Sequence, residues 1–142
     1  MSHATYAAAV GSYCLYRLYR YAEWKQKNTR IMKLAKDTRE KRDSKIWEFK
    51  LDGVDVDKIL GLNVVELREG LIDGEFKSVD LVNVFGERSY RIGRVLNLSA
   101  EENFGEALKM AAEKDLQTEE ARRRETLSSL PILHGIPFSV KD

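Results

Sequence analysis

Cysteine and histidine are scarce in this sequence, and their scarcity bears on two kinds of site. Cys14 is the only cysteine among 142 residues, so no disulfide can form within the chain. A reducing, intracellular compartment is therefore the simpler expectation. The two histidines, His3 and His134, lie far apart, and no cluster of Cys and His has metal-ligand spacing. We therefore expect no metal site.

Long uninterrupted apolar runs are also lacking. Residues 4–16 are thirteen residues without a charge, about 20 Å of helix at ~1.5 Å per residue. That is short of the ~30 Å hydrocarbon core of a bilayer. Extension to Trp24 gives enough length but places Arg17 and Arg20 inside the span. The N-terminus has no charged n-region and no cleavage site after its apolar run, so we expect no secretory signal.

Residues 1–45 combine aromatic and basic side chains and form the first predicted region. Residues 4–24 hold five tyrosines and one tryptophan, which suit the headgroup layer of a membrane. Residues 17–45 carry eleven Lys/Arg against four Asp/Glu, while the rest of the chain carries thirteen against nineteen. Such a basic segment is attracted to anionic lipid. We therefore expect a helical region whose residues 4–45 contact a membrane surface, as an interfacial or marginally spanning anchor.

Two other interpretations of residues 1–45 stay open. An ordinary helix could pack its Tyr and Leu side chains on the rest of the protein. Alternation of aromatic and basic residues, as in residues 16–21, also fits nucleic-acid binding by stacking and phosphate contact. No recognised nucleic-acid motif follows, however, and the remainder of the chain is acidic. We therefore expect no nucleic-acid partner.

Two short helices are predicted between residues 63 and 88. Asn63 can cap the amide groups that follow it, and Glu66 can reach back to form a capping box. Gly74 is expected to end this helix. Ser78 is expected to start the next one, which would bury a stripe formed by Leu81, Val82 and Phe85.

A third helix is predicted from residue 99 onward. Ser99 and Glu102 have capping-box spacing, and apolar residues at helical spacing follow them as far as Ala112. Residues 95–98 before this helix are predicted to be an extended link. Residues 117–130 after it are predicted to be a polar connector, helical at most at first.

The last ten residues alternate in period two, which predicts a strand. Ile136, Phe138 and Val140 would share one face of it, and Pro137, Ser139 and Lys141 the other. A lysine held at the end of an apolar strand loses hydration, which lowers its pKa and lets the amine accept protons. The alternative is a lysine that extends into solvent where its strand ends.

The run Leu133–Asp142 (LHGIPFSVKD) resembles the conserved lysine block of the amidase signature family. Earlier parts of the chain resemble the same family in the same order: residues 74–82, the Leu96-Asn97 pair and the alanine-containing helix that follows. The resemblance covers about residues 58–142. It implies that Lys141 is the catalytic base, acting through a bridging serine to activate a second serine that attacks an amide carbonyl. Both serines would follow Lys141 in a Gly/Ser-rich segment, so residues 1–142 alone are expected to be inactive.

These observations lead to one expected architecture and two competing functions. We expect an α/β protein: the helical N-terminal part and first core strand of a fold with a mixed sheet surrounded by helices. Residues 1–45 would form the aromatic and basic region, and residues 46–142 the incomplete amidase domain. The resemblance implies hydrolysis of carboxylic amides without a cofactor. A hydrophobic segment followed by a basic one is also the layout of the family's fatty acid amide hydrolases, which favours lipid amides. The competing function is a non-catalytic helical membrane adaptor or interaction protein.

Overall fold

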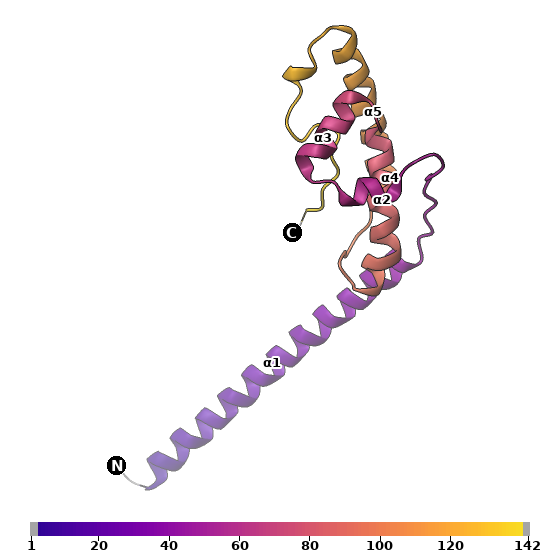
Figure 1. The fold of residues 1–142 in the computed structure, drawn as a ribbon. Coiled ribbons are helices and arrows are strands. Elements are labelled where there is room, and N and C mark those ends of the chain that lie inside the picture. Colours follow the sequence, from indigo (N-terminus) through magenta and orange to yellow (C-terminus); the bar gives the residue numbers. More distant parts are fainter. Residues whose placement is uncertain (1–2, 141–142) are drawn as a thin grey trace. The chain divides into compact units, whose positions relative to one another are not determined.

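The computed structural model describes residues 3–140, and every regular element in that range is helical. The chain forms two compact units, Met1–Ser44 and Lys45–Asp142. Because residues 3–140 contain no strand, the expected α/β class is wrong, and the described protein is a small helical one. Figure 1 shows the course of the helices along the chain.

The first unit is one long helix, α1, which spans His3–Asp43. Its aromatic side chains are exposed: Tyr13, Tyr16 and Trp24 each keep about 60% of their surface accessible. Tyr21 stacks with Trp24, with ring centroids 6.0 Å apart. Within residues 3–140, no helix is both long enough and apolar enough to cross a membrane.

Over its described residues, 45–140, the second unit contains four α-helices and two short helical turns. Figure 1 shows their order along the chain. The α-helices are α2 (Val56–Gly61), α3 (Val64–Asp73), α4 (Ser78–Arg88) and α5 (Phe104–Arg123). A π-helical turn, η1 (Ser89–Gly93), extends α4, and a 3₁₀ turn, η2 (Leu127–Ser129), follows α5. The helices α4 and α5 pack against each other and form the support for the C-terminal segment.

Local capping residues set the bounds of α3, as predicted. The side chain of Asn63 accepts hydrogen bonds from the amides of Val65 (2.9 Å) and Glu66 (3.1 Å). The carboxylate of Glu66 accepts the Asn63 amide at 2.7 Å, which completes the capping box. Gly74 ends the helix with φ +80°, a left-handed conformation that glycine adopts without a Cβ penalty.

The hydrophobic core lies among α2, α3 and α4. The predicted start of α4 at Ser78 is confirmed, and its stripe is buried as predicted at Leu81 and Val82, with Phe85 half-buried. Fully buried Leu81 and Val84 meet side chains from the two preceding helices. The buried core residues are Ile59, Leu67, Leu71, Phe76, Leu81 and Val84.

The predicted capping box at Ser99 is wrong. Helix α5 begins at Phe104, and Glu102 is instead drawn into a buried ion pair. Its carboxylate accepts hydrogen bonds from Arg94 (2.7 Å) and from the Trp47 ring (3.0 Å). The charged pair and the Trp47 donor together outweigh one local cap, because charge-assisted hydrogen bonds are the stronger ones. The helix also continues to residue 123, through the first half of the predicted connector.

The two segments predicted to be extended are turns or irregular coil. Asn97 has φ +52° and donates its amide to the carbonyl of Arg94, so residues 95–98 turn rather than extend. Residues 132–135 also turn, and residues 136–140 are irregular rather than a strand. A strand needs a neighbour to pair its backbone groups, and no described segment supplies one. The alternating side chains therefore do not share one buried face. Ile136 packs on the core, while Phe138 is 78% exposed.

The Glu102 ion pair provides a test of this arrangement. Replacement of Glu102 by Ala leaves Arg94, whose side chain is only 15% exposed, without its main partner. We expect unfolding free energy to fall by about 3 kcal/mol, the usual result of breaking a buried pair from one side. The adjacent exposed Glu101→Ala is the control, with an expected change within about 0.5 kcal/mol. Equal urea-unfolding midpoints for the two variants would contradict the assignment.

Candidate functional site

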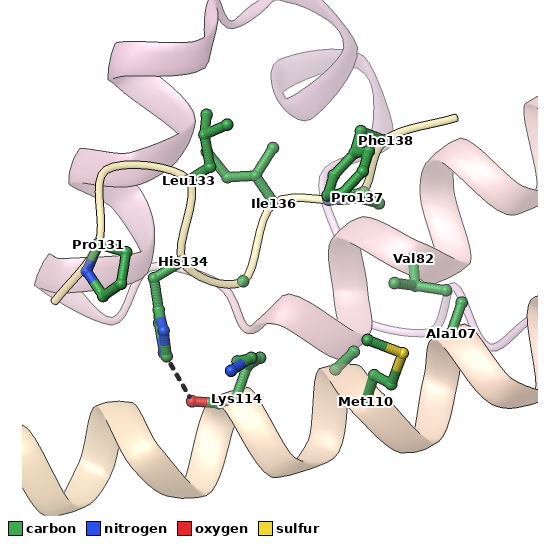
Figure 2. Close-up of a pocket in the computed structure, with 12 residues that line it drawn as sticks. Val82, Ala107, Met110, Lys114, Pro131, Leu133, His134, Ile136, Pro137 and Phe138 are labelled. Atoms are coloured by element: carbon green, nitrogen blue, oxygen red, sulfur yellow. Dashed lines mark hydrogen bonds between the residues drawn. The ribbon is translucent and has the colours of Figure 1, made fainter. Parts of the chain in front are cut away.

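The proposed base, Lys141, lies outside the described residues, but the segment that leads to it is described. Residues 131–138, called the docking segment below, lie beside α5 (Figure 2). At Gly135 the segment also reaches Ser78, the first residue of α4. The segment begins with a turn in which the His134 amide bonds the Pro131 carbonyl at 3.0 Å. A second such bond joins the Ile136 amide to the Leu133 carbonyl at 3.2 Å. The site is therefore a folded turn seated on two helices.

His134 attaches the docking segment to α5. Its Nε2 lies 3.2 Å from the carbonyl oxygen of Lys114 and 3.1 Å from Oγ1 of Thr118 (Figure 2 draws the first contact). A carbonyl oxygen only accepts, so the contact with Lys114 is a hydrogen bond in the tautomer that carries its proton on Nε2. The Thr118 hydroxyl donates to the same carbonyl at 2.9 Å, which turns its lone pairs toward the imidazole. His134 thus donates to a polar pair built into the helix.

Gly135 brings the same turn against α4. Its φ is +77°, a left-handed conformation that side-chain-bearing residues adopt at a cost. A Cβ at this position would collide with Oγ of Ser78 and approach a methyl group of Leu71 to 3.3 Å. Ser78 is 1% exposed, and its hydroxyl has no hydrogen-bond partner among the described residues. Both the backbone conformation and the close approach therefore require glycine.

Asp115 joins the two helices at this point. Its carboxylate accepts the backbone amides of Ser78 (2.6 Å) and Val79 (3.2 Å), the first two residues of α4. These amides have no partner within their own helix, and a negative charge there also complements the helix dipole. Because Asp115 follows Lys114 directly, one turn of α5 holds both the start of α4 and His134.

An open apolar groove of about 380 Å³ lies beside the docking segment. Figure 2 shows Val82, Ala107 and Met110 on the helices opposite Ile136 and Phe138 of the segment. Lys114 and His134 are its polar members. The sequence pattern predicted apolar residues at helical spacing as far as Ala112. It gave no sign of the groove, because the other wall of the groove is a turn at residues 132–135 that was not predicted.

The roles of the polar groups are structural rather than chemical. The Asp115 carboxylate bonds backbone amides, and His134 Nε2 bonds a backbone carbonyl. Among residues 3–140, no group of three or more His, Cys, Asp and Glu could hold a metal ion. Sequence analysis did not identify Asp115 or Thr118, since neither belongs to a motif. Ser78 lies 37 residues from Asp115, and His134 lies 16 residues from Thr118.

Comparison with known proteins gives one partial similarity. The chain is 35% identical over 85 residues to fatty-acid amide hydrolase 2-B of the zebrafish Danio rerio. The match covers 59% of this chain and 16% of that protein, so it spans less than a fifth of the relative. No protein-family model matches the sequence, and no solved structure matches it. The similarity is therefore partial: it relates this part of the chain to part of a protein that is named a fatty-acid amide hydrolase.

The Asp115 contact predicts a measurable loss of stability. Asp115→Ala leaves two amides at the start of α4 without an acceptor, and we expect unfolding free energy to fall by about 1–2 kcal/mol. Asp115→Asn keeps one acceptor oxygen, so its free energy of unfolding should lie between those of Asp115→Ala and the parent. Exposed Glu113→Ala, on the same helix, is the matched control. If chemical denaturation shows that Glu113→Ala lowers the free energy of unfolding as much as Asp115→Ala does, or more, the capping role is wrong.

Proposed function

We propose that residues 46–142 form part of an amidase-type hydrolase that cleaves carboxylic amides through an acyl-enzyme. The observation that carries the proposal is the similarity to a fatty-acid amide hydrolase, together with the lysine block at Leu133–Asp142. The geometry is compatible with it, because the first half of that block is seated on α4 and α5. A segment that must present a catalytic group needs such support.

In this proposal Lys141 supplies the proton transfers. A neutral lysine amine accepts a proton from the bridging serine, which takes one from the attacking serine as the latter bonds the amide carbonyl carbon. The proton returns through the same groups to the leaving amine when the carbon–nitrogen bond breaks. Water then repeats the sequence to release the acid. The name of the zebrafish relative concerns fatty-acid amides, and we propose lipid amides as the substrate class here.

The proposal predicts the behaviour of Lys141 variants. In a protein that joins this sequence to the Gly/Ser-rich segment carrying both serines, Lys141→Ala should lower kcat by about 10²–10⁴-fold, because general base catalysis is lost. Lys141→Arg should be almost as slow, since guanidinium stays protonated at neutral pH. Residues 1–142 alone should not turn over a fatty amide or anilide, because the proposal places both serines after Asp142.

Two results would count against this function. The first is Lys141→Arg activity within a few-fold of the parent near pH 7, with folding verified by circular dichroism. Such a result would reject Lys141 as the base. The second is an absence of turnover in the serine-containing protein on any fatty or short-chain amide, which would favour the non-catalytic interaction protein.

We further infer that α1 binds an anionic membrane surface. The support is the exposure of its aromatic side chains along residues 6–24, next to a strongly basic stretch. Tyrosine and tryptophan rings are amphipathic and fit the headgroup layer, where their polar ends stay hydrated. Lysine and arginine beside that layer add attraction to anionic headgroups, at about 1 kcal/mol each.

Vesicle binding tests this inference. The chain should co-sediment with vesicles of phosphatidylserine and phosphatidylcholine, and binding should weaken with added salt. Replacing three basic residues of α1 by Gln should lower the apparent affinity at least tenfold. These residues are Lys25, Lys27 and Arg30.

The matched control removes the same net charge from the second unit. It replaces three exposed cations by Gln: Lys50, Lys109 and Arg123. If this control weakens vesicle binding as much as the α1 variant does, net charge rather than α1 explains the binding. Equal binding to vesicles of pure phosphatidylcholine would also contradict recognition of anionic lipid.

A further inference from the structure

We propose that His134 and Gly135 are positioning residues for the base: they clamp the docking segment to α5 and α4 ahead of Lys141. The inference rests on the amidase function proposed above and extends it to residues with no assigned role. Neither side chain needs to touch substrate for this role. What they determine is where the chain that carries the lysine leaves the helical support.

The first half of the clamp is a directional bond to a rigid acceptor. His134 Nε2–H points at the Lys114 carbonyl and the Thr118 hydroxyl, at 3.2 and 3.1 Å. Thr118 is only 9% exposed, and its hydroxyl is already fixed by donation to the same carbonyl. Both acceptors belong to one turn of α5, so the imidazole can satisfy them in only one placement.

The second half is a steric contact with the neighbouring helix. Gly135 lies so close to the Ser78 hydroxyl that no larger residue fits, and Ser78 is the first residue of α4. Consecutive residues of the turn thus touch two different helices. One contact fixes the position of the turn, and the second fixes its orientation.

Asp115 closes these contacts into a ring. It follows Lys114, which accepts from His134, and it bonds the amide of Ser78, which abuts Gly135. The start of α4 therefore cannot shift relative to this turn of α5 without breaking a charge-assisted bond of 2.6 Å. The two anchors of the docking segment keep a constant separation as a result.

The chain beyond the ring has less support from the described residues. Ile136 packs partly buried against the core, but Phe138 is 78% exposed. Pro137 restricts the backbone between them, because its ring locks φ. The direction of the residues that follow is consequently set at residues 134–137. Small displacements there matter, since a misplacement of about 1 Å in a catalytic group can cost about 10²-fold in rate.

Two separate amide variants of His134, to Gln and to Asn, distinguish the effect of the hydrogen bond from the effect of side-chain size. The amide nitrogen of Gln reaches the place of imidazole Nε2, whereas that of Asn matches Nδ1 and falls short of α5. In the serine-containing amidase, we expect His134→Asn and His134→Ala to lower kcat by about 10–100-fold with KM within about threefold. His134→Gln should restore kcat to within a few-fold of the parent.

The kinetic result distinguishes positioning from a purely structural role. A structural role would reduce the amount of folded enzyme and leave kcat per folded, active-site-titrated molecule unchanged. Full kcat in His134→Ala, or equal loss in His134→Gln and His134→Ala, would overturn the proposal. Thr118→Val, which removes the hydroxyl at nearly constant volume, should lower kcat in the same direction as His134→Asn.

A steric double variant tests the Gly135 contact. Gly135→Ala should lower kcat, because its Cβ meets the Ser78 hydroxyl and its backbone is left-handed. Adding Ser78→Gly removes the obstructing hydroxyl and should recover part of the loss, the part due to collision. Strictly multiplicative effects of the two changes on kcat would show that the residues do not act through this contact.

A measurement without turnover keeps the clamp separate from the amidase function. In residues 1–142, nitrogen-15 NMR of the neutral His134 ring should show the Nε2–H tautomer, and Thr118→Val should accelerate exchange of that proton. An Nδ1–H tautomer would leave Nε2 able only to accept from the Thr118 hydroxyl, and would overturn the proposed bond to the Lys114 carbonyl whatever the enzyme does. The two outcomes can also separate. If the expected tautomer is found but the serine-containing protein hydrolyses no amide, the proposed function is wrong and the attachment of the turn to α5 still holds.

Discussion

The carboxylate of Asp115 at the start of α4 is the interaction on which the arrangement around the docking segment depends. Two unpaired helix amides require an acceptor, and a side chain from α5 provides it at 2.6 and 3.2 Å. That contact fixes the position of the start of α4 along the axis of α5. It thereby fixes the distance between Ser78, which limits Gly135, and the Lys114 carbonyl, which binds His134. A capping bond between helices thus determines where a third segment can lie.

Short-range signals in the sequence predicted elements correctly where neighbours along the chain supply the hydrogen bonds. The cap at Asn63, the stop at Gly74 and the start at Ser78 are confirmed. The capping box predicted at Ser99 is wrong because the Glu102 carboxylate accepts hydrogen bonds from Arg94 and Trp47 instead. Residue spacing along the chain does not reveal such tertiary contacts. The predicted strand failed for a related reason: alternation describes which side chains could share a face but not whether a paired strand exists.

The candidate site was predictable in part. The resemblance located the lysine block at Leu133–Asp142, and Gly135 lies within it. The meaning of that glycine emerges only from the proximity of Ser78, 57 residues earlier in the sequence. His134 likewise has no distinguishing local pattern, because its acceptors are a backbone carbonyl and a threonine hydroxyl. Backbone acceptors leave no trace in residue identity, so contacts of this kind cannot be inferred from sequence spacing.

The long helix α1 is not stabilised by a hydrophobic core of the kind that stabilises the second unit. Its tyrosines and tryptophan are exposed, so burial of apolar surface contributes little to its stability in water. Two of its ion pairs, Arg20–Glu23 and Lys36–Glu40 at 3.7 Å, are exposed and add little. A bilayer interface would change that balance, because inserting the rings removes apolar surface from water and places the basic side chains beside anionic headgroups. The helical form of α1 should therefore gain more stability from anionic vesicles than the second unit does, whose core is formed by its own α2, α3 and α4.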